Sequence, residues 1–121
     1  MRIRVIAQTQ SDFDSWQQEQ IHISTTPTVG EPARGAQIFQ QKTCVNCHTV
    51  AGTRANGHIS PDLRHLGSRQ TIGAGIMENT QPNLARWLAN TQSVKPGSLM
   101  PNMRLSDSKV NALVAYMEAL R

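Results

Sequence analysis

The feature that most constrains this chain is the run Cys44-Val45-Asn46-Cys47-His48, which has the spacing C-x-x-C-H. Two thiols three positions apart on a helical turn can each add to one vinyl group of a porphyrin, and the adjacent imidazole then lies beneath the iron. The chain has two cysteines in all, which excludes a multi-disulfide framework and a four-cysteine zinc site. The motif therefore predicts one covalent haem c, attached through Cys44 and Cys47, with His48 as an axial ligand.

Two other interpretations of the motif are a thioredoxin-like redox pair and half of a zinc site. A redox pair is expected after a strand within a βαβ unit, and no such pattern precedes Cys44. A zinc site needs a second pair of suitably spaced ligands, and His58 and His65 do not form one. Covalent haem is the interpretation that the surrounding sequence favours.

A second axial ligand is sought among the methionines downstream of the motif. Met100 lies in K-P-G-S-L-M-P, an irregular segment whose prolines can hold a thioether in place, and it is the predicted ligand. Met103 is the next choice, and Met100 as a simple gap filler stays open. The remaining candidates are Met77, which has no special context, and His58 and His65, which would give bis-histidine ligation.

Composition fits a core that is completed by a cofactor. Hydrophobic residues make up 38% of the 121 residues, below the roughly 45–50% that is typical of globular proteins. Only 17% of the residues are charged, so the composition is not that of a disordered chain. A porphyrin supplies a large apolar surface on which short helices can pack. The aromatic residues are Phe13, Trp16, Phe39, Trp87 and Tyr116.

The net positive charge of the chain comes from its larger, second part. Residues 1–34 carry three basic and four acidic side chains, for −1, and residues 35–121 carry nine and four, for +5, which together give +4. Haem propionates account for part of this excess, so an acidic partner is allowed but not required. The basic residues stand singly and without interleaved aromatics, which argues against nucleic acid.

Three segments are predicted: 1–23, 24–32 and 33–121. Residues 1–7 alternate as in a half-buried strand, and Ser11 is the expected N-cap of a helix that runs through Phe13, Trp16 and Ile21. A lone strand needs a sheet partner, so this segment is expected to be the end of a β domain. Residues 24–32 are rich in Ser, Thr, Pro and Gly and are expected to form a linker.

The segment 33–121 is predicted to be all-α, with four or so short helices and long loops. The final helix has the clearest pattern: Ser106 caps it, and an i, i+3, i+4, i+7 stripe follows, in which Met117 is expected to be core. The other expectations are a helix at 32–42, a loop at 56–67, a weak short helix at 71–77, a helix at 82–90, irregular chain at 93–101, and the stripe Val110, Leu113, Val114, Met117 and Leu120.

Three stretches of this segment, in order, resemble class I cytochrome c. They are G-A-Q-I-F-Q-Q-K-T-C-V-N-C-H, S-P-D-L-R-H-L-G-S-R and W-L-A-N-T-Q-S-V-K-P-G-S-L-M-P, and the resemblance covers nearly all of residues 35–121. It implies the class I fold around a covalent haem c, thioethers at Cys44 and Cys47, and axial ligands His48 and Met100.

The resemblance also implies roles for residues around the haem. The Pro61 carbonyl would accept the ring N–H of His48 and orient that ring. Arg69, and also Ser98, would meet the propionates. Leu63, Leu66 and Leu88 would line the haem faces, and Trp87 would lie near the methionine ligand.

Two further points concern the helices and loops of the family. Gly35 and Phe39 match a helix that crosses the last helix near Tyr116, where glycine permits close approach. The sequence departs from the family at Ser60, where glycine is usual, and at Thr91, where proline is common.

The N-terminal residues M-R-I-R-V-I-A-Q-T-Q-S-D-F-D-S-W resemble the end of the copper-binding domain of cytochrome c oxidase subunit II, where the last strand precedes an F-x-x-W helix. In that family a methionine at the place of Met1 binds copper, but the other copper ligands are absent from this chain. Met1 is thus either the counterpart of that copper-binding methionine, without the other ligands of the site, or an initiator methionine. An unrelated N-terminal extension is the alternative. The order strand, helix, linker and cytochrome c is that of subunit II with a fused cytochrome.

These resemblances imply an electron-transfer domain that takes single electrons from a donor protein and passes them to the copper centre of its own oxidase, among the other oxidase subunits. Ligation by His and Met leaves no open position on the iron, so the domain would not be an enzyme by itself but part of an enzyme subunit. Alternatives are a free-standing periplasmic carrier, a cytochrome c domain of another dehydrogenase, and a haem peroxidase or gas sensor with open iron.

The expected location is the periplasmic face of the bacterial inner membrane, because haem attachment at C-x-x-C-H is extracytoplasmic in the family. The chain has no apolar run of about 20 residues and no signal peptide. We therefore expect a soluble fragment whose membrane contact lies in a missing upstream part.

Overall fold

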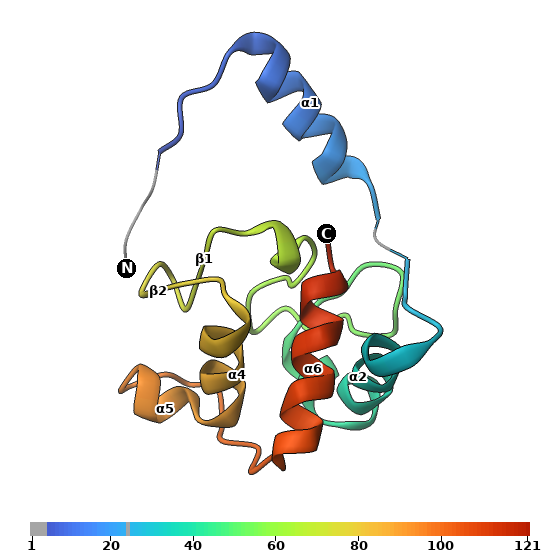
Figure 1. Cartoon of the computed structure of the whole chain (residues 1–121), viewed down its shortest axis with the longest axis vertical. Coiled ribbons are helices and arrows are strands. Elements are labelled where there is room, and N and C mark those ends of the chain that lie inside the picture. Colours follow the sequence, from blue (N-terminus) through green and yellow to red (C-terminus); the bar gives the residue numbers. More distant parts are fainter. Residues whose placement is uncertain (1–4, 24) are drawn as a thin grey trace.

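A computed structural model of the chain describes residues 5–23 and 25–121, and this part is mostly helical. Helices α2 and α4 both pack on α6, while α1 lies outside this group, between two extended segments (Figure 1). The elements in order are α1 (Gln10–Ile21), α2 (Gly30–Gln41), α3 (Cys44–Cys47), the 3-10 helix η1 (Leu66–Ser68), β1 (Thr71–Ile72), β2 (Met77–Glu78), α4 (Gln81–Ala89), α5 (Thr91–Val94) and α6 (Asp107–Ala119).

The crossing of α2 and α6 is the largest contact between elements. Gly35 makes it possible: a Cβ there would overlap the carbonyl oxygen of Ala112 and lie 2.7 Å from the Cβ of Tyr116. The Phe39 and Tyr116 rings pack beside this point, with centroids 5.7 Å apart. The predicted close approach of the two helices at Gly35 is confirmed.

The apolar stripe of α6 forms the centre of the core. Ser106 is its N-cap residue, as predicted, although its side chain makes no capping hydrogen bond. Met117 is buried among apolar side chains, which confirms its assignment to the core. The predicted stripe residues Val110, Leu113, Val114, Met117 and Leu120 are all buried.

Residues 71–77 are not the short helix that the sequence predicts. Strands β1 and β2 form an antiparallel hairpin in which Thr71 pairs with Glu78 and Ile72 with Met77. The G-A-G turn between them has positive φ at all three positions, 73 to 75. A right-handed helix requires negative φ, so this turn excludes the predicted helix.

Helix α1 begins earlier than predicted, and Thr9 rather than Ser11 is its N-cap. The Thr9 hydroxyl accepts a hydrogen bond from the backbone N–H of Asp12 and donates one to its carboxylate, at 3.2 and 2.6 Å. No residue of α1 is buried; Phe13 and Trp16 stack at 5.7 Å and remain 44% and 47% exposed.

The predicted N-terminal strand at 1–7 and the predicted linker at 24–32 both differ from the structure in part. Residues 1–4 of the predicted strand lie outside the described residues, and Val5 to Ala7 are exposed and form no strand, so the strand of a β domain is not shown. The last three residues of the predicted linker, 30–32, belong to α2. Within the described residues no helix is long and apolar enough to cross a membrane.

Candidate haem-binding site

The C-x-x-C-H motif forms its own helical turn. Cys44 and Cys47 begin and end α3, and His48 is its C-cap, with its backbone N–H donating to the Cys44 carbonyl at 3.0 Å. Both thiols are free and half-buried. A single turn thus carries two thiols and an imidazole, the set that covalent haem attachment requires.

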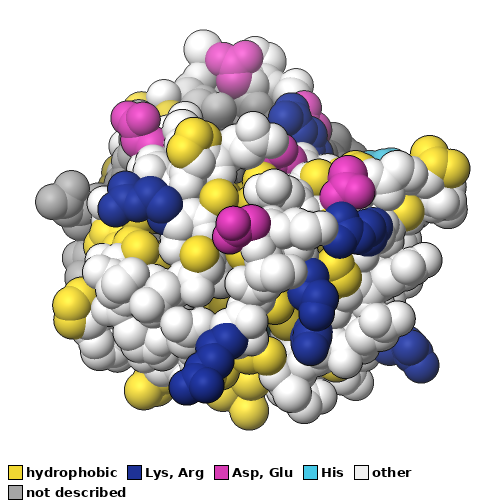
Figure 2. All heavy atoms as spheres, turned by 60° about the horizontal axis from the view of Figure 1, so that its bottom comes forward, with side chains coloured by type: hydrophobic (Ala, Val, Ile, Leu, Met, Phe, Trp, Pro, Cys, Tyr) yellow, Lys and Arg dark blue, Asp and Glu magenta, His cyan; other side chains and the backbone are white. Residues whose placement is uncertain are grey.

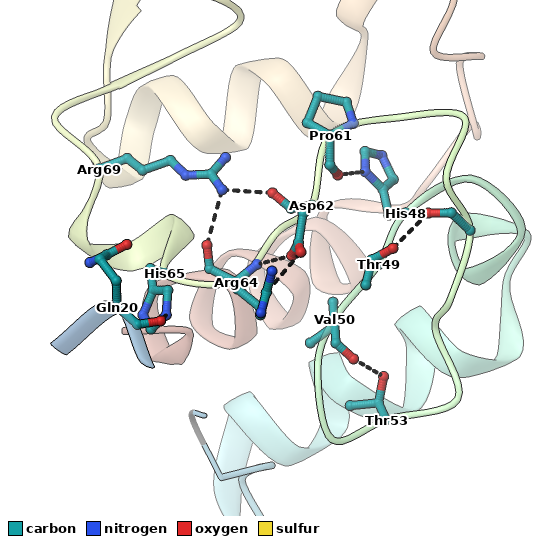
Figure 3. Close-up of polar contacts among 11 residues, drawn as sticks. Gln20, His48, Thr49, Val50, Thr53, Pro61, Asp62, Arg64, His65 and Arg69 are labelled. Atoms are coloured by element: carbon teal, nitrogen blue, oxygen red, sulfur yellow. Dashed lines mark hydrogen bonds and ion pairs between the residues drawn. The ribbon is translucent and has the colours of Figure 1, made fainter. Parts of the chain in front are cut away.

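The His48 ring is oriented by Pro61. Nδ1 of His48 lies 2.7 Å from the Pro61 carbonyl oxygen (Figure 3), so the hydrogen bond expected between them is present. Because a carbonyl can only accept, the proton is on Nδ1, and the lone pair of Nε2 is left to bind a metal. This tautomer is the one that an iron ligand needs.

The loop after His48 closes against the attachment turn. Thr49 donates from its hydroxyl to the Gly57 carbonyl at 2.8 Å, and the Ser60 N–H donates to the Cys47 carbonyl at 2.9 Å. A Cβ at Gly57 would lie 2.6 Å from the backbone of Asn46 and Cys47. Glycine is therefore required there, whereas serine at position 60 is accommodated.

Residues 95–105, which connect α5 to α6 and are called the methionine segment below, are held at Met100 by side chains of α5. The half-buried Met100 has its backbone carbonyl bonded by Thr91 Oγ1 at 2.9 Å and by Gln92 Nε2. Met103, the alternative ligand, has its sulfur 3.7 Å from the hydroxyl of Thr43, which donates to it. These contacts favour Met100, because its carbonyl rather than its sulfur is engaged.

The alternative histidine ligands are placed less favourably. Nε2 of His65 donates to the carbonyl of Gln20 at 3.2 Å (Figure 3). His58 is exposed on the loop that follows Gly57. Bis-histidine ligation gains no support from these positions.

The side chain of Arg69 is held in place by backbone carbonyls of the loop that follows Pro61. Its Nη2 donates to the carbonyls of Asp62 and Arg64 at 2.6 and 3.0 Å (Figure 3). Burial lowers the pKa of the Arg69 guanidinium, and the Asp62 carboxylate partly opposes this. The guanidinium stays charged at neutral pH, as a propionate partner must. Ser98, the other predicted propionate contact, is half-buried on the methionine segment.

The predicted apolar lining divides into one buried and three half-buried side chains. Leu66 is 7% exposed and belongs to the core. Leu63, Trp87 and Leu88 are half-buried and pack against that core.

Residues 32–121 match the family described as cytochrome c. The chain belongs to the cytochrome c family. A cytochrome c domain implies haem c, and the residues here fit that group, since two free thiols and an imidazole with an available Nε2 meet on one turn.

Three of the proteins to which the chain is similar are respiratory enzyme subunits. The chain is 32% identical over 122 residues to cytochrome c oxidase subunit 2 of Alkalihalophilus pseudofirmus and 31% identical over 126 residues to that of Bacillus subtilis; all of the chain and 35% of each relative are covered. It is 25% identical over 100 residues to a nitric oxide reductase subunit of Cereibacter sphaeroides, and this match covers 78% of the chain and 64% of the relative. The chain thus spans about a third of the length of the oxidase subunits.

The other interpretations of the motif gain no support in this cytochrome c domain. Burial raises the pKa of the Cys44 thiol and Cys47 adds to the effect, against a smaller lowering by a backbone hydrogen bond and Lys42. A thioredoxin-like nucleophile needs a lowered pKa. Within the described residues, no three His, Cys, Asp or Glu side chains are grouped as a metal site would require.

Sequence reasoning missed three residues that position this site. Asn79 donates from Nδ2 to the carbonyls of Leu66 and Arg69 at 2.7 and 2.9 Å. Thr91 and Gln92 hold the Met100 carbonyl. The one available signal was the departure from the family pattern at Thr91.

Proposed function

We propose that the chain is an electron-transfer haem c domain that takes single electrons from a donor protein and passes them to the copper centre of a cytochrome c oxidase. The observation that carries this proposal is the His48–Pro61 hydrogen bond of 2.7 Å, directly after the two cysteines. It holds an imidazole in the tautomer that binds iron, at the position where a haem would be attached.

The roles of the chain's own residues follow from this arrangement. Cys44 and Cys47 would hold the porphyrin through thioethers, His48 and Met100 would ligate its iron, and Arg69 and Ser98 would meet its propionates. A haem c bound there supplies a one-electron ferric/ferrous couple. Occupation of both axial positions by the protein favours a carrier over a peroxidase or gas sensor, which needs an open position.

The relatives support an oxidase as the electron acceptor, since two of them are named cytochrome c oxidase subunit 2. We infer that residues 1–23 are the end of the copper-binding domain of such a subunit, on the periplasmic side of the membrane, and that residues 24–29, the part of the predicted linker before α2, tether the cytochrome c domain to it. The tether would raise the effective concentration of the domain at the copper centre. A cytochrome c domain of another respiratory complex is the second candidate, favoured by the similarity to the nitric oxide reductase subunit.

Docking of the donor is expected to be weak and not dominated by charge. On the face drawn in Figure 2, the Lys and Arg side chains stand apart from one another, with Asp and Glu among them. Such a mixed surface gives little electrostatic steering, and transient redox encounters bury little area.

The test uses the haem-loaded protein and the variants Met100→Ala and Met103→Ala. We expect the ferric wild type and M103A to show the far-red absorption band of a thioether on ferric iron and to bind no carbon monoxide when reduced. M100A should lose the band and bind carbon monoxide. A wild type without the band that binds carbon monoxide readily would refute the carrier function.

The acceptor is tested separately. The reduced wild-type domain should be reoxidised by a purified cytochrome c oxidase that contains a copper centre in its subunit II. If the domain keeps the far-red band but is not reoxidised by that oxidase, the carrier function stands and the oxidase assignment is wrong.

A further inference from the structure

Thr91 is a polar side chain in an apolar place. It is the first residue of α5 and is 1% exposed. Burial of a hydroxyl costs free energy unless the group is hydrogen-bonded. The partner of Thr91 is the backbone carbonyl of Met100, nine residues away, at 2.9 Å.

The same carbonyl has a second side-chain donor. Nε2 of Gln92 also donates to the Met100 oxygen. A carbonyl oxygen has two lone pairs, so these two donors saturate it. Two neighbouring residues of one short helix thus donate hydrogen bonds to the same peptide group of the methionine segment.

These two bonds matter because backbone hydrogen bonds do not hold the segment. Within the described chain, residues 99–105 make no backbone–backbone hydrogen bond. The peptide bond that Thr91 and Gln92 hold joins Met100 to Pro101, whose ring restricts φ and lacks an N–H. With the carbonyl held, the position of the Met100 Cα is restrained, and so is the region that its thioether can reach.

We propose that Thr91 and Gln92 are positioning residues that hold the Met100 thioether on the iron and oppose its displacement by other ligands. The proposal rests on the proposed function, in which Met100 is an axial ligand. Proline, the residue common at position 91 in the family, has no side-chain donor, so this chain uses a hydrogen bond that the usual residue cannot make.

Loss of the Thr91 donor is expected to shift the equilibrium between a closed state, in which the Met100 thioether is on the iron, and an open state, in which it has left. An external ligand such as imidazole binds where the thioether has left, so its apparent affinity scales with the open fraction. Removal of a hydrogen bond made only in the closed state raises that fraction. We expect about tenfold tighter imidazole binding on loss of the Thr91 donor, equivalent to about 1.4 kcal/mol.

The experiment titrates the ferric, haem-loaded protein with imidazole and follows the far-red band. Thr91→Val keeps the shape but removes the donor, and Thr91→Ser keeps the donor. The matched control is Thr53→Val, because the hydroxyl of Thr53 also donates to a backbone carbonyl, that of Val50 at 2.8 Å, but not to that of Met100. The measured quantities are the apparent imidazole affinity and the band intensity at zero imidazole.

We expect T91V to bind imidazole about tenfold more tightly than wild type, and T91S and T53V to stay within about twofold. Equal affinities for T91V and wild type, or an increase in T53V as large as in T91V, would overturn the proposal. If T91V does not fold, Gln92→Leu removes the other donor from a half-buried position and must show the same increase. Failure of the proposed function is distinct: the wild type itself would then lack the band, and Met100→Ala would not change imidazole binding.

Discussion

Replacement of Gly35 by alanine tests the architecture most directly. The added Cβ would overlap the Ala112 carbonyl oxygen and lie 2.7 Å from both the Ala112 carbonyl carbon and the Tyr116 Cβ. Optimal contacts between such atoms are about 3.5 Å or longer. The obstructing atoms belong to the backbone of α6 or to its Cβ, so no rotamer change can relieve them. Helix α2 must therefore move away from α6.

Two opposing contributions set the change in the free energy of unfolding of G35A. Alanine stabilises a helix interior by about 1 kcal/mol relative to glycine. Overpacking in a well-packed core costs about 1–3 kcal/mol, and we expect the upper end because the contact also positions the buried Phe39 and Tyr116 rings. The net loss in the free energy of unfolding is about 2 kcal/mol, or a fall of about 10 °C in Tm for a domain of this size.

The assay is denaturant unfolding of the haem-loaded protein, with the midpoint and slope measured for G35A and wild type. Gln37 is exposed on the same helix, and Gln37→Gly compared with Gln37→Ala measures the propensity term alone. We expect alanine to be the more stable residue at position 37 and the less stable one at position 35. A G35A variant as stable as wild type, with the usual alanine advantage at position 37, would refute the close approach of α2 and α6.

Three further predictions concern single polar or glycine residues. Tyr116→Phe should stabilise the protein by about 1 kcal/mol, because the buried Tyr116 hydroxyl has no hydrogen-bond partner among the described residues. Burial raises the pKa of Tyr116, so the folded state keeps a proton that the unfolded state loses above about pH 10. The free energy of unfolding of the wild type should therefore fall as the pH rises above about 10, and that of Y116F should fall less. Parallel curves of stability against pH for the two proteins would contradict this. Gly57→Ala should lower the haem-to-protein ratio, because its Cβ would lie 2.6 Å from the Asn46 backbone; a ratio equal to that of wild type would show that the loop yields. Asn79→Ala should lower the free energy of unfolding by about 2 kcal/mol, since its two bonds of 2.7 and 2.9 Å go to backbone carbonyls, and a loss below about 0.5 kcal/mol would mean that water replaces them.

Features that depend on local periodicity could be predicted from the sequence. The stripe of α6 and the need for glycine at position 35 follow from residue spacing and from the family resemblance, and both are confirmed. The N-cap of α1 was misplaced because Thr9 and Ser11 are both good capping residues. The choice was decided by Asp12, which exchanges hydrogen bonds with Thr9.

Other features depend on geometry that spacing does not show. The G-A-G turn at 73–75 looked compatible with a short helix, and its positive φ angles become apparent only in the folded chain. The Thr91–Met100 hydrogen bond joins residues nine positions apart across an irregular segment, and no periodic pattern predicts such a contact. The family resemblance indicated which residues bind the haem, while the tautomer of His48 required its partner to be located.

The crossing of α2 and α6 also has a consequence for how the domain assembles. Residues 42–106 separate the two helices, so closing the core costs loop entropy of about 4 kcal/mol before any packing is gained. Such long-range closure slows folding and cannot take place until α6 has been synthesised. The two cysteines lie within this separating segment, just after α2. Both thiols are therefore synthesised before the core can close, while the chain that follows them is still unfolded.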